Sequence, residues 1–173
     1  MLEGNDTETK TPHTTEAKRV SDRELVIRRV FNARPRTVFE AMTKPELLRR
    51  WWAPKALGVV LFEVESEARV GGRYRFVFGR PGNPPMAFSG VYTEVVPGER
   101  LAYTQIFEPM PDTGDGLITA TFEKHAAGTL FVSHELYPSK EVLDGALASG
   151  MERGMRETLE QLAVLVRELD ATV

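Results

Sequence analysis

The pattern of hydrophobic and polar residues changes its period twice along the chain. Apolar residues first alternate with polar ones over Glu24–Phe31, which predicts a strand. Two short helical patterns follow. The first begins at Pro35, since proline suits the first helical position, where its missing N–H costs no hydrogen bond. The second opens where Thr43 and Glu46 have the spacing of a capping box, which predicts a new helix start.

Six more segments with strand character follow, separated by turns rich in Gly and Pro. Because successive strands joined by short turns pair antiparallel, these segments predict a meander. From about Ser139 to Leu169 the period becomes helical and predicts one long amphipathic helix. The six segments are roughly 58–65, 72–78, 86–95, 100–107, 117–123 and 129–136.

These elements predict an α+β fold, in which a curved antiparallel sheet of about seven strands wraps around one terminal helix. Two short helices follow the first strand. A strongly curved sheet and a helix diverge at one end and leave space between them. We therefore expect a cavity of roughly 300 Å³ or more between the sheet and the terminal helix, within the usual range for ligand pockets.

Length and composition predict a single domain. The chain has 173 residues, of which 42% are hydrophobic, enough for one core. Residues 1–22 contain no aromatic side chain and are rich in Thr, Glu, Asp and Lys, so we expect a disordered tail there and the domain over 23–173. The absence of cysteine excludes disulfides and thiolate-ligated metals.

Charge and motifs exclude several further classes of function. A net charge of -3 provides no cationic face for nucleic acid. No stretch approaches the roughly 18 apolar residues of a membrane span, and the N-terminus lacks a signal peptide, so we expect a cytoplasmic protein without membrane insertion. The three histidines lie far apart in the sequence, and phosphate-loop and dinucleotide fingerprints are missing, so we expect neither metal nor cofactor.

Several local motifs, in this order and spacing, resemble one known family. They are Asn32–Phe39, Trp51-Trp52-Ala53-Pro54, Arg69–Tyr74, Gly90–Leu101 and Gly150–Gly154. Together they resemble the bacterial branch of the SRPBCC superfamily (START and Bet v-like domains) that is named after the activator of the heat-shock-protein-90 ATPase. The resemblance extends over about residues 23–169 and implies a helix-grip fold. Members bind lipids, sterols or polyketides, and some cyclise or hydrolyse them. Met155 stands where relatives often have Trp.

Strand alternation selects the residues that we expect to line the cavity. Side chains two apart share one face of a strand, so the aromatic residues of three consecutive strands fall on common faces. We expect Trp51 to pack inward and Trp52 to lie near the entrance, while flexible methionines form the helix side. His134 is the one histidine inside a predicted strand and is the candidate general base. The predicted ligand-binding set is Trp51, Trp52, Tyr74, Phe76, Phe88, Tyr92, Tyr103, Phe107, His134, Met151 and Met155.

Three functions remain open at this level. The first is the binding of a small hydrophobic or amphipathic molecule in the cavity. The second is an enzyme of cyclase, aromatase or hydrolase type, in which His134 acts on a ligand in the same cavity. The third is an interaction module, either a chaperone regulator or a homodimer, which would show an exposed apolar patch.

Overall fold

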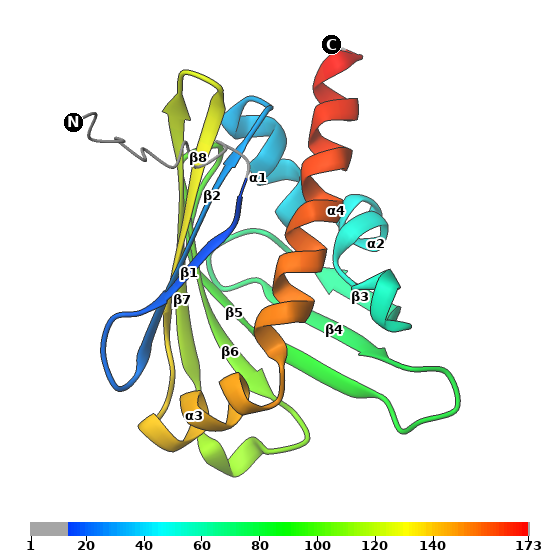
Figure 1. Cartoon of the computed structure of the whole chain (residues 1–173), viewed down its shortest axis with the longest axis vertical. Coiled ribbons are helices and arrows are strands. Elements are labelled where there is room, and N and C mark those ends of the chain that lie inside the picture. Colours follow the sequence, from blue (N-terminus) through cyan, green and yellow to red (C-terminus); the bar gives the residue numbers. More distant parts are fainter. Residues whose placement is uncertain (1–13, 173) are drawn as a thin grey trace, which may run out of the picture.

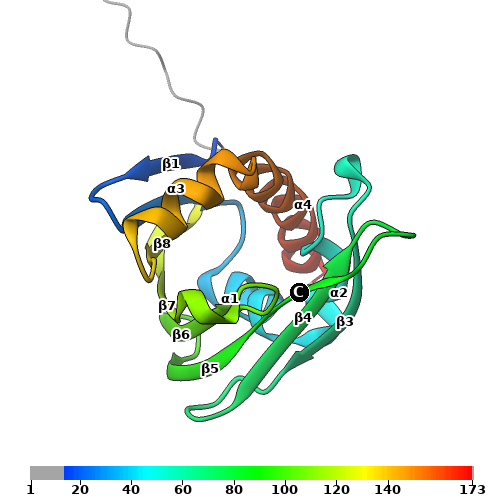
Figure 2. The ribbon, with the colours of Figure 1, turned by 90° about the horizontal axis from the view of Figure 1, so that it is seen from below.

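One eight-stranded antiparallel sheet dominates the fold, in the order β1-β2-β8-β7-β6-β5-β4-β3 (Figure 1). The computed structural model describes residues 14–172. Viewed from below, the sheet curves around the molecule, and α3 and α4 close its open side (Figure 2). The strands are β1 (Glu16–Arg19), β2 (Glu24–Phe31), β3 (Val60–Ser66), β4 (Arg73–Gly79), β5 (Met86–Val96), β6 (Arg100–Phe107), β7 (Gly116–His125) and β8 (Gly128–Leu136).

The helices are α1 (Pro35–Thr43), α2 (Pro45–Trp51), α3 (Lys140–Ala148) and α4 (Met151–Ala171), with short 3-10 turns η1 (Lys55–Leu57) and η2 (Pro111–Thr113). The α+β helix-grip fold predicted from the sequence is confirmed. No helix within residues 14–172 is long and apolar enough to cross a membrane.

The predicted capping box at the start of α2 is wrong. Thr43 is the last residue of α1, and its hydroxyl donates to the carbonyl oxygen of Phe39 at 3.0 Å. Lys44 is the N-cap of α2 and makes no side-chain cap. Pro45 occupies the first helical position, so proline rather than a cap marks this helix start.

The predicted single terminal helix is divided in two. Gly150 has φ +81° and ψ +18°, a left-handed conformation that glycine adopts without steric cost, and it separates α3 from α4. Ser139 begins α3, because its hydroxyl accepts a hydrogen bond from the Val142 N–H at 3.2 Å. As a result α3 crosses the lower end of the sheet, whereas α4 runs along its length (Figure 1).

The predicted N-terminal tail needs a correction. Its residues 1–13 lie outside the described part of the chain. Residues 16–19, however, form β1 and pair antiparallel with β2. Thr15 is buried, its hydroxyl accepts from Arg29 Nη1 at 3.2 Å, and its carbonyl oxygen accepts from Arg156. Composition did not reveal this strand because polar contacts, rather than burial of large apolar side chains, attach the segment.

At one end of the core, α1, α2 and the C-terminal half of α4 pack against β2, β7 and β8; the same buried cluster continues to Tyr74, Phe76 and Tyr92 of β4 and β5. Phe39 of α1 packs edge-on against Phe122 of β7, with ring centroids 5.4 Å apart. Trp51 is buried, and its indole N–H donates to the carbonyl oxygen of Ala41 at 2.8 Å. Each fully buried side chain of this size contributes about 1.5–3 kcal/mol, so this end fixes the position of α4.

Candidate functional site

The two ends of the interior differ in how completely their side chains are buried. On α4, Leu162 and Val166 are fully buried against the core. One and two turns before Leu159 on the same stripe, Met155 and Met151 are only half-buried. Helix α4 therefore seals the end near α1 and α2 and covers the end near α3 less completely.

Five aromatic side chains form a continuous group on the inner face of the sheet at this less covered end. Phe76, Phe88 and Phe107 are neighbours across β4, β5 and β6. The rings of Phe88 and Phe107 are 5.2 Å apart. The half-buried Trp52 contacts Phe76 and Phe78, each at 5.1 Å between centroids. We call Trp52, Phe76, Phe78, Phe88 and Phe107 the aromatic group; it offers a broad apolar surface.

Three tyrosines continue this inner face. The Tyr74 ring lies 5.3 Å from that of Tyr103, and Tyr92 lies 6.0 Å from Tyr103. The Tyr74 hydroxyl donates to the carbonyl oxygen of Thr104 at 2.6 Å, and the Tyr92 hydroxyl is 2.7 Å from Ser66 Oγ. Protein groups thus satisfy the hydroxyls of Tyr74 and Tyr92.

Glycine at position 90 makes room for Tyr74. Gly90 is the register partner of Tyr74 on β5. A Cβ atom at Gly90 would lie 1.9 Å from the carbonyl oxygen of Thr104 and 2.8 Å from the Tyr74 ring. No side chain fits there, so the missing Cβ allows the close contact among Tyr74, β5 and β6.

The hydroxyl of Tyr103 differs from the other two. Within residues 14–172 it has no hydrogen-bond partner, yet it is not one of the fully enclosed unpaired atoms, of which Arg29 Nε is the single case. Burial nevertheless raises the pKa of Tyr103 above its ordinary value. The Tyr103 hydroxyl is therefore available to a water molecule or a ligand.

Glu135 of β8 also lies on the inner face, where its register partners Leu25 and Ile118 are buried. The Tyr137 hydroxyl donates to Glu135 Oε2 at 3.0 Å. No ion pair in the described part of the chain includes Glu135. Burial raises the pKa of Glu135 to about 7, and its charge contributes to raising the pKa of Tyr103. We call Tyr103, Glu135 and Tyr137 the polar end.

The structure contradicts the prediction that His134 faces the cavity. Its side chain lies on the outer face of the sheet, is 45% exposed, and places Nε2 3.4 Å from Glu24 Oε2. Alternation explains this placement, because Phe131 and Glu135 share the inner face and His134 falls between them. Within residues 14–172, no group of three or more histidine, aspartate and glutamate side chains is positioned to bind a metal ion.

Sequence reasoning thus found most of the inner face but missed its acid. The aromatic residues and tyrosines of β4, β5 and β6 come together as expected, with Trp52 beside them, whereas Trp51 belongs to the core. Glu135 and Tyr137 were missed. The alternation of side chains along β8 could have identified Glu135, since Glu135 is two residues from Ser133 and four from Phe131, which are both buried.

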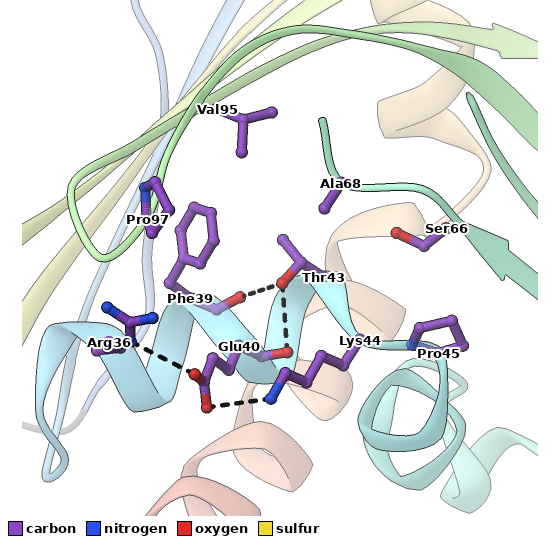
Figure 3. Close-up of a pocket in the computed structure, with 10 residues that line it drawn as sticks. All are labelled: Arg36, Phe39, Glu40, Thr43, Lys44, Pro45, Ser66, Ala68, Val95 and Pro97. Carbon is purple, nitrogen blue, oxygen red and sulfur yellow. Dashed lines mark hydrogen bonds and ion pairs between the residues drawn. The ribbon is translucent and has the colours of Figure 1, made fainter. Parts of the chain in front are cut away.

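A separate cleft of about 310 Å³ opens beside α1 (Figure 3). Phe39 and Thr43 point into it, and Arg36, Glu40 and Lys44 lie along one side, where Glu40 forms ion pairs with both cations at 3.5 Å. None of its lining residues belongs to the terminal helix or to the predicted ligand-binding set. The lining comprises Arg36, Phe39, Glu40, Thr43, Lys44, Pro45, Ser66, Ala68, Val95 and Pro97.

A curved antiparallel sheet closed by a terminal helix defines a helix-grip protein, and its inner face here is amphipathic. The model of the family "Activator of Hsp90 ATPase homolog 1-like protein" matches residues 32–167. The chain therefore belongs to this family, an SRPBCC-type family, as its motifs predicted.

Solved structures agree with this assignment. A protein from Chromobacterium violaceum is 33% identical with a TM-score of 0.72, over 83% of this chain and 97% of that one. One from Rhodobacter sphaeroides is 26% identical with a TM-score of 0.81, over 89% and 99%. A third, from Mycobacterium smegmatis, is 23% identical with a TM-score of 0.78, over 88% and 96%, and supports the fold alone. No curated protein matched the chain.

Proposed function

We propose that the protein binds a small amphipathic molecule on the inner face of the sheet, at the end near α3. The apolar part of the ligand lies against the aromatic group, and its polar part reaches the polar end. The fold is consistent with a ligand-binding domain in general. The observation that carries the proposal is the Tyr103 hydroxyl, which is shielded from bulk solvent yet has no hydrogen-bond partner in the described part of the chain, residues 14–172.

The energy of unpaired polar groups supports this interpretation. A buried donor or acceptor without a partner costs about 1–3 kcal/mol, so native interiors pair nearly all of them. Water or a ligand would satisfy Tyr103. Met151 and Met155 of α4 are half-buried and pack against the core, and flexible thioethers accommodate ligands of different shapes.

Native mass spectrometry of the protein purified from its own host tests whether a small molecule accompanies it. Binding is then measured with the neutral fluorescent probe N-phenyl-1-naphthylamine. We expect Met155→Trp to weaken probe binding at least about tenfold, because a larger ring occupies the space beside the aromatic group. Val164→Trp, at an exposed position of the same helix, should bind as the wild type does. Unchanged binding by a folded Met155→Trp variant would contradict the proposal.

A proton-transfer reaction at the same site is a second candidate function. One observation favours it: Glu135, with a pKa of about 7 and a hydrogen bond from Tyr137, is suited to accept or donate a proton near neutral pH. Glu135 would replace His134 in this role. If the co-purified molecule is converted by the wild type, Glu135→Gln should lower its turnover by about 100-fold or more, while His134→Ala should leave it unchanged.

A further inference from the structure

We infer that the polar end binds a protonated amine, so that the ligand is an amphipathic organic cation. The inference rests on the proposed function, because it names the ligand class of that same site. It begins from an imbalance of charge: the polar end contains a carboxyl group, and no cation among residues 14–172 forms an ion pair with it.

The groups around Glu135 show this imbalance. From the neighbouring strands, β2 and β7 present Leu25 and Ile118, which are buried and apolar. From β6 and from the residues after β8, Tyr103 and Tyr137 face the carboxyl group; burial raises the pKa of both, so they are uncharged near neutral pH. An ionised carboxylate in such surroundings is costly unless a positive charge or several donors compensate it.

The nearby charged side chains are engaged elsewhere. Asp144 of α3 is 2.6 Å from Arg19 and 2.8 Å from Lys140. Arg23 is exposed and donates to the carbonyl oxygen of Tyr137 at 2.9 Å. None of these cations forms an ion pair with Glu135 within residues 14–172. An ammonium group on a ligand would supply the positive charge that these side chains do not give to Glu135.

Helix α4 begins near the polar end with Met151. Glu152, in the first turn of α4, forms an ion pair with Arg156 at 3.0 Å. On the sheet, the buried Tyr92 lies beside Tyr103 and also raises its pKa. Asp115, just before β7, raises the pKa of Tyr74. Over residues 14–172, no basic side chain of these elements forms an ion pair with Glu135.

The aromatic character of the site favours the same ligand class. The electron-rich faces of Tyr rings attract ammonium groups, and this attraction strengthens where water is excluded. Tyrosine hydroxyls can also accept a hydrogen bond from an amine. Beyond Tyr103 the aromatic group provides an apolar surface for the rest of the molecule. A carboxylate beside tyrosine rings, next to a phenylalanine-rich surface, matches an ammonium group carrying an apolar body.

Matched amines and alcohols test the inference. Hexyl, octyl and decyl amines and the corresponding alcohols are used to displace N-phenyl-1-naphthylamine near pH 8. We expect the amine of the best-fitting length to bind at least about tenfold more tightly than its alcohol. Glu135→Gln should remove this preference by weakening amine binding to the level of the alcohol. Glu141→Gln, an exposed acid on α3, should preserve it.

A pH titration of the wild type gives a second readout that does not depend on any variant folding. Because a proton and the ammonium group compete for the carboxylate, amine affinity should fall about tenfold from pH 8 to pH 6, while alcohol affinity stays nearly constant. If alcohols bind and amines bind no better, the inference is wrong and the proposed function stands. If amines are preferred with no pH dependence, Glu135 is not their partner and the inference is also wrong. If neither the naphthylamine probe nor any alcohol or amine binds, the proposed function itself fails.

Discussion

At the scale of single residues, the position of Glu135 has consequences for the stability of the fold. Burial raises the pKa of this carboxyl from 4.5 to about 7 in the folded protein, and the hydrogen bond from Tyr137 only partly offsets that effect. The folded state therefore binds this proton more tightly than the unfolded chain does. Its contribution to stability is greatest at low pH and declines as the pH rises from the unfolded to the folded pKa.

Glu135→Gln should remove this pH dependence. Relative to the variant, the wild type should lose roughly 2 kcal/mol of unfolding free energy between about pH 5 and about pH 8, because the raised pKa makes the ionised carboxylate unfavourable. Urea unfolding of both proteins at the two pH values measures the difference. If the difference in unfolding free energy between the wild type and the variant is the same at both pH values, the carboxyl group is not desolvated.

The tyrosines provide a second comparison between residues. Tyr74→Phe removes a hydrogen bond to the carbonyl oxygen of Thr104 and should lower the unfolding free energy by about 1 kcal/mol. Tyr103→Phe removes a hydroxyl that has no hydrogen-bond partner among the described residues, so it should change stability by less than about 0.5 kcal/mol. Denaturation in urea distinguishes the two. Equal losses would contradict the difference between the two hydroxyls.

At the scale of elements, the junction between α3 and α4 decides what covers the lower end of the sheet. A continuous helix over 139–169 would extend straight past that end, whereas the left-handed Gly150 turns the chain so that α3 crosses it (Figure 1). Leu143 of α3 is fully buried as a result. The break therefore helps to enclose the interior.

Two glycine substitutions test this junction. Gly150→Ala should lower the unfolding free energy by about 1–2 kcal/mol, because alanine is strained at φ +81° although nothing lies within 4 Å of the added Cβ. Gly145→Ala, inside α3 and equally free of neighbours, should raise it by up to about 1 kcal/mol. Thermal or urea unfolding measures both. Stabilisation by both substitutions would mean that α3 continues into α4.

At the scale of the whole molecule, a buried cation connects segments that are distant in sequence. Arg29 of β2 is 3% exposed, its Nη1 lies 2.5 Å from Glu160 Oε1 on α4, and it also donates to Thr15 before β1. Its guanidinium group lies 5.7 Å from the ring centroid of Phe31. This contact fixes α4 against the sheet at mid-length, between the sealed core and the less covered end.

Glu160→Ala should be more damaging than the loss of an ordinary surface ion pair. It leaves the buried Arg29 without its carboxylate and should cost about 2 kcal/mol of unfolding free energy. Glu168→Ala, which removes an exposed pair to Arg50 at 3.5 Å, should cost less than about 0.5 kcal/mol. Urea unfolding of the two variants gives the comparison. Similar small losses would show that Glu160 does not compensate Arg29.

Much of the fold could be predicted because its signals are local. Arg100–Phe107 was expected as a strand with the bounds that β6 has, since alternation and turn residues operate over a few positions. The N-terminal β1 was missed because its attachment depends on Arg29 and Arg156, which are distant in sequence. The break at Gly150 was missed because the apolar stripe continues across it.

The candidate site shows the same division. Alternation of side chains placed the tyrosines and phenylalanines of β4, β5 and β6 on one face of the sheet, and this placement follows from strand geometry alone. His134 was chosen over Glu135 for its chemistry, because histidine titrates near neutral pH in water. The enclosure that brings a glutamate to a pKa of about 7 exists only after β2, β7 and β8 have assembled around it.

By itself, the sequence determined the family, the order and pairing of most strands, and the aromatic inner face, because periodicity, turn residues and local motifs encode these features directly. Only the tertiary structure decided which end of the interior α4 seals, where the chain turns at Gly150, and which acid faces inward. Those outcomes depend on burial and on contacts between distant segments, and burial is a property of the assembled molecule rather than of any stretch of residues.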